Sequence, residues 1–289
     1  MPTALIKRLV LLLSVIAASS LGTPSAHALT TYARTWVSGA GTNNSECSVT
    51  TPCQTFAQAI GVTASGGEID CLDPGDFGAV TISISVTIDC ERVSNGGITQ
   101  TAGGADAITV NTADTVVNLI GLDINGVNSF AVGVVIEAAA VVNIRNCKIY
   151  GFSTNYGLSI STGTLVIDNV LVTNNGTGIW VYNSGGVANM TVRNSNINNN
   201  GTGIIVGVYG GTHGGATIEQ STLAFNTQYG LEVYNSGAVA VLGGSTLVNN
   251  ATAVVSSSGG TIYSFKNNQI GGNATDGTPL TGYPGGPLN

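Results

Sequence analysis

Charge is scarce in this chain. Only 8% of its 289 residues are Asp, Glu, Lys or Arg, against roughly 25% in ordinary globular proteins. Aromatic residues make up 6%, and His213 is the only histidine after residue 28. With one such histidine and no suitable cysteine cluster, the sequence predicts no metal site and no cofactor.

Long apolar runs are also rare, and the one that stands out lies near the start. Residues 1–28 combine Lys7 and Arg8, an apolar run and a small-residue ending, which is typical of a secretory signal peptide. We expect cleavage after Ala28 and a secreted or periplasmic protein without membrane insertion, because no other segment could span a bilayer. Without residues 1–28, 6 basic residues face 15 acidic ones, which disfavours nucleic acid as a partner.

A six-residue repeat is abundant instead. It consists of an aliphatic residue or Phe, any residue, a small Asn-like residue, two more residues and a second aliphatic. Its copies begin at Leu119, Ile144, Ile167, Val192, Ile218, Leu242 and Phe265, 23 to 26 residues apart. A period near 24 without helical periodicity predicts a solenoid of short strands, in which each coil buries its apolar face against the next.

The Asn-like position of the repeat is expected to be structural. Inward residues of one strand are an even number apart, yet the two aliphatics are separated by five, so a bend must reset the alternation. Asn146, Asn169, Asn194 and Asn267 lie where this bend is expected. Asparagine tolerates the left-handed conformation, and its amide can bond to the asparagine of the next coil.

The start of the chain lacks the repeat. Phe56, Ala59 and Ile60 follow Pro52 with a helical spacing, which predicts a short helix that covers the open end of the solenoid. The expected organisation is a signal peptide at 1–28, a cap segment at 29–65, the solenoid at 66–272 and a flexible Gly/Pro-rich tail at 273–289.

A family resemblance supports this interpretation. The segment Gly66–Gly75, which reads GGEIDCLDPG, is followed by Val80–Ile82 and Val86–Ile88. It resembles the opening coils of right-handed parallel β-helix proteins of the pectate-lyase-like superfamily. The resemblance covers Arg34 to Asn273 and implies an all-β fold, a right-handed parallel β-helix with a short N-terminal capping helix. It implies no single activity, since that superfamily includes lyases, hydrolases, methylesterases, tailspikes and adhesins.

Five cysteines form two candidate pairs with one left over. Cys47 and Cys53 share a short loop, and Cys71 and Cys90 end two matching strands. Both pairs are candidate disulfides in an oxidising compartment. Cys147 falls on the same side as the aliphatics and is expected to be buried and unreactive.

Most charges of the central coils fall in one outward row. The row is expected to read Ile120, Arg145, Asp168, Arg193, Glu219, Gly243 and Lys266. Arg145 and Arg193 could hold an acidic sugar beside Asp168 for proton abstraction, which makes these three the candidate catalytic residues. Alternatively, the alternating signs simply avoid like-charge stacking, and the alternation itself favours this second interpretation.

Aromatic side chains form a second candidate surface. Trp180, Tyr182, Tyr209 and Tyr234 are expected to point outward near Glu232, where rings could stack on sugar faces. The alternative is that these rings only cover the sheet beneath neighbouring loops.

The leading hypothesis is therefore a secreted β-helix protein that presents an extended surface to a polysaccharide or cell-surface glycan, without strong catalysis. One alternative is a lyase or hydrolase acting on an acidic polysaccharide. The other is an adhesin-like structural module on a cell surface.

Overall fold

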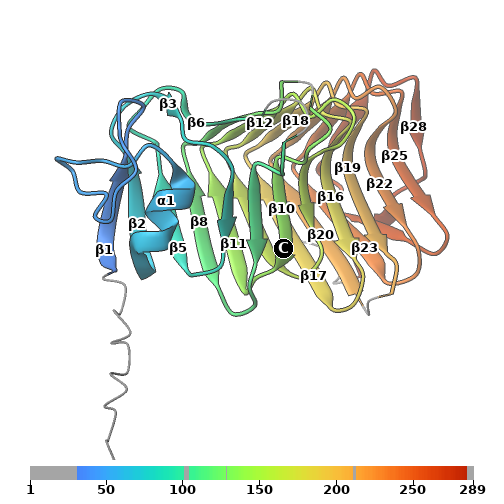
Figure 1. The fold of residues 1–289 in the computed structure, drawn as a ribbon. Helices are drawn as coiled ribbons and strands as arrows, with labels where there is room; N and C mark the ends of the chain where they lie inside the picture. The colour runs from blue at the N-terminus through green and yellow to red at the C-terminus, as the bar shows by residue number, and fades with distance from the viewer. Residues whose placement is uncertain (1–30, 101–103, 128, 211–212, 285–289) are drawn as a thin grey trace, which may run out of the picture.

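The chain winds into a solenoid of parallel strands. The computed structural model describes residues 31–100, 104–127, 129–210 and 213–284. Figure 1 shows the coils stacked in chain order from blue to red, so each coil contacts the one before and the one after it. Every strand pair in the described residues is parallel, and the predicted all-β solenoid is confirmed. No helix in these ranges has the length and apolar composition needed to span a bilayer.

From β2 to β28, each coil contributes one strand to each of three sheets, here called sheets 1, 2 and 3 in the order in which a coil visits them, and β1 and β29 extend sheet 1 at its two ends. Sheet 1 contains β1 (Tyr32–Val37), β2 (Thr63–Cys71), β5 (Val86–Asp89), β8 (Val116–Ile120), β11 (Val141–Arg145), β14 (Gly163–Asp168), β17 (Val187–Arg193), β20 (His213–Glu219), β23 (Ala238–Gly243), β26 (Thr261–Ser264) and β29 (Thr281–Gly282). Sheet 2 contains β3 (Gly75–Asp76), β6 (Gly96–Thr99), β9 (Asp123–Asn125), β12 (Lys148–Tyr150), β15 (Leu171–Thr173), β18 (Asn196–Asn198), β21 (Thr222–Ala224), β24 (Thr246–Val248) and β27 (Gln269–Gly271). Sheet 3 contains β4 (Val80–Ile82), β7 (Ile108–Asn111), β10 (Val134–Ala138), β13 (Tyr156–Ile160), β16 (Thr177–Asn183), β19 (Thr202–Val208), β22 (Tyr229–Tyr234), β25 (Thr252–Ser257) and β28 (Thr275–Gly277).

The bend between sheets 1 and 2 lies at the Asn-like position of the repeat. Asn146, Asn169 and Asn194 have φ values of 56°, 54° and 52°, in the left-handed region that asparagine tolerates. The amide of Asn169 donates to Asn146 at 2.8 Å, as expected for a ladder, but Asn194 donates to Asp168 instead. The predicted bend is therefore confirmed at these three positions. The predicted asparagine ladder is found only between Asn146 and Asn169.

The last copy of the repeat differs from the expectation. Ser264 pairs with Leu242 and Ile270 with Leu247, so this coil has one residue more between the two strands. The left-handed residue is then Lys266, with φ 64°, and not Asn267. Lys266 therefore leaves the outward row in which the sequence placed it.

A buried asparagine ladder holds the bend between sheets 2 and 3. Its members are Asn175, Asn200, Asn226, Asn250 and Asn273. Each of the first four donates its amide N–H to the Oδ1 of the next at 2.9 to 3.2 Å. That Oδ1 also accepts the preceding coil's backbone N–H at 2.9 to 3.1 Å. The ladder thus satisfies polar groups that burial would otherwise leave unpaired.

Cys147 occupies a place that serine takes in other coils. Ser195 and Ser221 each accept a backbone N–H from the preceding coil and donate to a carbonyl two residues earlier. Cys147 does the same, with Leu122 N at 3.3 Å and Arg145 O at 3.2 Å. Burial raises the pKa of its thiol to about 12, so the thiolate needed for nucleophilic chemistry is suppressed.

A short helix, α1 (Phe56–Val62), covers the first coils as expected. The Thr55 hydroxyl caps it by accepting from Gln58 N at 3.2 Å. Phe56 is buried and packs against Phe77 with ring centroids 5.0 Å apart. The solenoid begins earlier than predicted, however, because β1 already pairs with β2 inside the expected cap segment.

The end of the solenoid also lies later than predicted. Residues 273–289 were expected to form a flexible tail, but β28 and β29 pair with β25 and β26. Thr275 N and Thr278 N donate to Ala251 O and Val254 O at 3.0 Å each. Backbone pairing with the preceding coil outweighs the Gly- and Pro-rich composition here, because backbone groups need no particular side chain to pair.

The buried asparagine ladder yields a stability prediction. We expect Asn200→Ala to lower the free energy of unfolding by about 2–4 kcal/mol, because Val172 O and the backbone N–H of Asn175 lose their buried partner. The exposed Asn196→Ala in the same coil is the control and should change it by less than about 0.5 kcal/mol. Chemical denaturation monitored by circular dichroism measures both. Equal effects of the two substitutions would contradict the structural role of the ladder.

Candidate functional site

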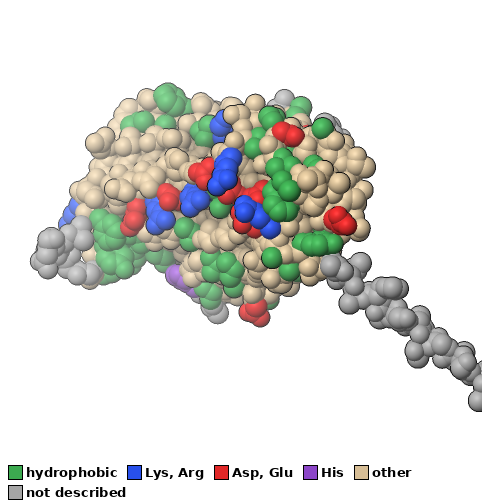
Figure 2. All heavy atoms as spheres, turned by 90° about the vertical axis from the view of Figure 1, so that its left-hand side faces the viewer, with side chains coloured by type: hydrophobic (Ala, Val, Ile, Leu, Met, Phe, Trp, Pro, Cys, Tyr) green, Lys and Arg blue, Asp and Glu red, His purple; other side chains and the backbone are tan. Residues whose placement is uncertain are grey.

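The charged row lies on the outer face of sheet 1, in the predicted register. Arg145 pairs with Asp168, Asp168 with Arg193, and Arg193 with Glu219 across neighbouring strands. Figure 2 shows basic and acidic side chains close together in a band across the face that it displays. The register thus brings the three candidate catalytic residues together.

Ion pairs occupy these three side chains. Arg193 lies 3.2 Å from Asp168 Oδ2, and the amide of Asn194 donates to the other carboxylate oxygen at 2.9 Å. Arg145 pairs with Glu91 at 3.6 Å, a partner that the repeat could not indicate because Glu91 lies outside it. Both oxygens of Asp168 are therefore engaged, which leaves the carboxylate poorly placed to accept a proton from a substrate.

A shallow groove runs along this row. It has a volume of about 250 Å³ and is lined by Asn118, Ile120, Asn143, Ile144, Arg145, Val166, Asp168 and Arg193. The candidate catalytic residues therefore border an open groove. The arrangement can hold an anionic group between two guanidinium groups, provided that their present acidic partners are displaced.

A second charged group lies on the first strands of sheet 1 and was not identified from the sequence. Arg34 forms hydrogen bonds to Asp70 and to Glu68, and Asp89 lies close enough to complete a cluster of three carboxylates. Burial, followed by repulsion from Asp70, raises the pKa of Glu68. Arg34 already supplies a positive charge to this cluster, so the cluster forms part of the salt-bridge network of sheet 1.

Lys148 and Asp123 form a further ion pair on sheet 2, at 3.9 Å. The register of β9 and β12 pairs these two residues across neighbouring strands.

The aromatic residues gather on the outer face of sheet 3. Ring centroids are 4.4 Å apart between Tyr156 and Trp180, 4.6 Å between Trp180 and Tyr182, 4.6 Å between Tyr182 and Tyr209, and 5.4 Å between Tyr209 and Tyr234. We call these five residues the aromatic row. Tyr156 was not among the candidates from the sequence, because it begins its strand and pairs with Thr177 and not with another aromatic residue.

Register and one glycine allow the rings to lie this close. Tyr182 and Tyr234 both pair with Gly207 of the coil between them. A Cβ at Gly207 would lie 2.7 Å from Cζ of Tyr234, so the Tyr234 ring lies over this glycine. The ring thereby reaches Tyr209, which directly follows β19.

Exposure differs along the aromatic row. Tyr209 is 51% exposed, whereas the other rings are half-buried against their neighbours. The indole Nε1 of Trp180 is buried and has no hydrogen-bond acceptor among the described residues. The rings therefore both cover the sheet and present a surface, so the two interpretations made from the sequence each describe part of the row.

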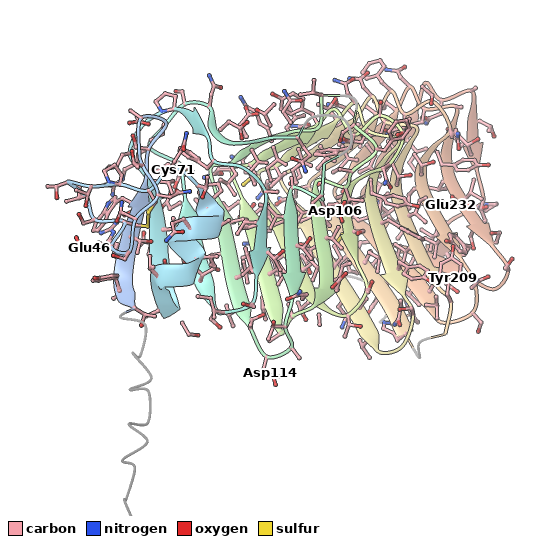
Figure 3. All side chains as sticks on the ribbon, in the orientation of Figure 1. Glu46, Cys71, Asp106, Asp114, Tyr209 and Glu232 are labelled. Carbon is pink, nitrogen blue, oxygen red and sulfur yellow. A yellow bond between two sulfur atoms is a disulfide. The ribbon has the colours of Figure 1, made fainter. Side chains whose placement is uncertain are left out.

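Glu232 lies next to the aromatic row on β22. It follows Trp180 and Ile205 in the same outward register, and Figure 3 shows it near Tyr209 on the later coils. Burial raises the pKa of its carboxyl group. A half-buried carboxylate beside aromatic rings is a strong hydrogen-bond acceptor for hydroxyl groups.

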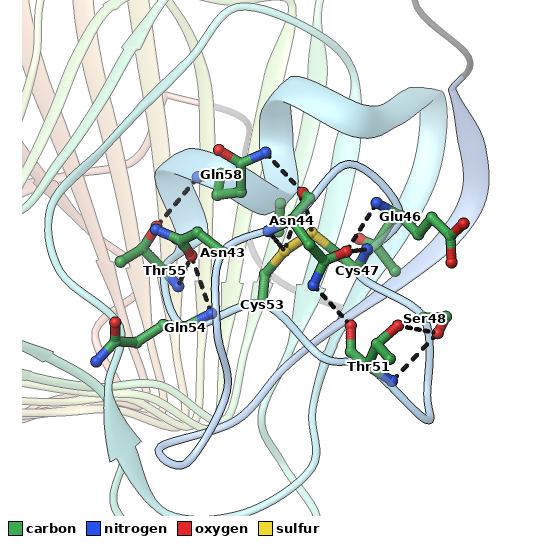
Figure 4. Close-up of a disulfide and its surroundings, with 12 residues drawn as sticks. Asn43, Asn44, Glu46, Cys47, Ser48, Thr51, Cys53, Gln54, Thr55 and Gln58 are labelled. Atoms are coloured by element: carbon green, nitrogen blue, oxygen red, sulfur yellow. Dashed lines mark hydrogen bonds between the residues drawn. A yellow bond between two sulfur atoms is a disulfide. The ribbon is translucent and has the colours of Figure 1, made fainter.

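Both candidate disulfides are formed. Cys47 and Cys53 are joined within their loop, beside the Asn44 side chain (Figure 4). Cys71 and Cys90 join β2 to the residue that follows β5. Cys147 is the remaining cysteine and is buried, as predicted.

Comparison with known proteins supports the handedness of the coil. A family model described as the right handed beta helix region matches residues 132–212. The chain is a right-handed parallel β-helix. The crystal structure of pectate lyase Pel9A is similar to it with a TM-score of 0.46 and 13% sequence identity, covering 87% of this chain and 80% of that chain. No curated protein sequence matches the chain, and a structural likeness this distant carries no information about substrate or activity.

The charged row of this β-helix yields a second prediction. Asp168→Asn should lower the free energy of unfolding by less than about 1 kcal/mol in low salt, because Arg193 and Asp168 are both partly exposed. The effect should disappear near 1 M salt, where the Debye length falls to about 3 Å. Urea denaturation at both salt concentrations measures it. A large loss that persists in high salt would show that the row contributes more than a solvated ion pair.

Proposed function

We propose that this protein binds a polysaccharide or cell-surface glycan on the outer face of sheet 3. The observation that carries the proposal is the aromatic row, in which five rings from neighbouring coils contact one another in a continuous line. Aromatic rings provide the flat apolar area on which sugar faces stack. The rigid β-helix holds these rings in place before binding, which limits the entropy lost on association.

Hydrogen-bonding groups flank the rings. Glu232 supplies a carboxylate, and the hydroxyl of the exposed Tyr209 can donate and accept. Burial raises the pKa of Tyr209, so its hydroxyl keeps its proton at neutral pH. Rings for the sugar faces and polar groups for the hydroxyls are the combination that carbohydrate recognition requires.

The proposed location is outside the cytoplasm. Two disulfides join Cys47 to Cys53 and Cys71 to Cys90, and such bonds persist in oxidising compartments. The signal peptide expected at 1–28 agrees with this location and lies outside the described residues.

Substitution of the exposed ring tests the proposal. Tyr209→Ala should weaken binding to a glycan selected on an array by about three- to tenfold, the contribution expected of one aromatic contact. The matched control is Tyr283→Ala, which removes an exposed tyrosine, 46% accessible, on the last coil. Isothermal titration calorimetry measures the affinities, and thermal unfolding verifies that both variants fold. Equal affinities of Tyr209→Ala and wild type would contradict the proposal, and absence of any glycan ligand would favour the adhesin-like structural module.

A second candidate function rests on the groove beside Arg145, Asp168 and Arg193. Its two guanidinium groups suit the carboxylate of an acidic sugar, so we retain a polysaccharide lyase or hydrolase as the alternative. For a lyase, incubation with a polyuronate should produce unsaturated products that absorb in the ultraviolet, and Arg193→Ala should abolish them. No ultraviolet absorbance combined with no new reducing ends would exclude both activities on that substrate.

A further inference from the structure

The bend between sheets 2 and 3 contains a row of residues with positive φ, here called the corner row. Its members are Gly151, Asn174, Asn199, Phe225, Asn249 and Gly272, with φ between 53° and 83°. Gly126 is the equivalent residue of the preceding coil, and Val127, with φ 47°, comes directly after it. Glycine and asparagine adopt this conformation at little cost, whereas branched and bulky side chains do so rarely. Phe225 is therefore the strained member of an otherwise relaxed row, and Val127, one residue past the row, holds the same kind of conformation.

Burial does not compensate for this strain. Val127 is 47% exposed and Phe225 is 55% exposed. Asparagine occupies the position of Phe225 in the coils immediately before and after it, at Asn199 and Asn249. A local conformation that costs free energy and gains no packing in the free protein is typical of residues that contact a ligand.

A groove of about 500 Å³ lies on this corner and extends along the row as far as Asn199, one coil before Phe225. Val127 borders it, Tyr150 and Asn125 come from sheet 2, and Asn174 and Asn199 are exposed members of the corner row. Phe225 comes next in the row, because Asn199 N bonds to Ala224 O at 3.1 Å. Burial and then Asp123 raise the pKa of Tyr150, which keeps its hydroxyl protonated.

The chemistry of the groove is neutral and rich in amides. None of its lining residues carries a charge, so the groove offers nothing to neutralise a uronate or a sulfate. An asparagine side chain presents one donor group and one acceptor in the same plane, which complements the N–H and C=O of an acetamido group. Val127 supplies an apolar contact for a methyl group within the groove, and Phe225, one coil beyond Asn199, offers a ring for the face of a sugar that extends along the corner.

We propose that the corner groove binds a neutral, N-acetylated oligosaccharide that runs parallel to the solenoid axis. Neighbouring coils are roughly 4.8 Å apart, a spacing comparable to the length of one sugar residue, so successive corner positions meet successive sugars. This site lies on the bend between sheets 2 and 3, separate from the aromatic row, and does not depend on the function proposed for that row.

The variant Phe225→Asn tests the proposal without weakening the fold. It places at this position the residue found in both neighbouring coils, so its thermal midpoint should rise above that of wild type. Its affinity for tetra-N-acetylchitotetraose should nevertheless fall at least tenfold in isothermal titration calorimetry. Cellotetraose, which has hydroxyl groups in place of the acetamido groups, should bind wild type at least tenfold more weakly.

Two controls separate the corner groove from other surfaces. Val116→Asn changes an exposed valine on sheet 1 and should leave binding of tetra-N-acetylchitotetraose unchanged. Trp180→Ala disrupts the aromatic row and should also leave it unchanged, which distinguishes this site from the one on sheet 3. The proposal is overturned if wild type does not bind tetra-N-acetylchitotetraose, if Phe225→Asn binds it as wild type does, or if Trp180→Ala abolishes binding. Equal affinity for cellotetraose would overturn the assignment of an N-acetylated ligand.

Discussion

Coil-to-coil hydrogen bonding in one register is the constraint on which the rest of this structure depends. No coil has enough apolar surface to fold alone, so each is stable only with its neighbours. Parallel pairing places every side chain above its equivalent about 4.8 Å away. A residue type can therefore occupy the same position in successive coils only if its side chain can lie directly against a copy of itself.

Inside the solenoid, this constraint selects residues that can bond to themselves. An asparagine amide donates and accepts at once, and Asn175, Asn200 and Asn226 use both functions to link successive coils. A serine hydroxyl has the same capacity, and Ser195 and Ser221 use it at the other bend. Cys147 shows that a thiol can occupy such a place, where burial suppresses its ionisation.

Outside the solenoid, the same constraint separates charges from rings. Arg145, Asp168 and Arg193 alternate because like charges in register would repel. Aromatic rings attract one another, so Trp180, Tyr182 and Tyr209 can lie together on sheet 3. The corner between sheets 2 and 3 does not follow this rule, because Val127 and Phe225 hold a backbone conformation that asparagine and glycine adopt more easily. Surfaces with different chemistry thus share one scaffold.

The sequence by itself determined the fold, because its period and its alternation depend only on the next coil. The spacing of Ile144 and Ile149 predicted a bend, and the matching ends of Cys71 and Cys90 indicated a disulfide. Only the tertiary structure decided which side chains pair across larger separations, such as Glu91 with Arg145 and Arg34 with Asp70. It also decided that Lys266 leaves the charged row and that residues 275–282 remain within the solenoid. These outcomes depend on loop length and backbone pairing, which the identity of individual side chains does not specify.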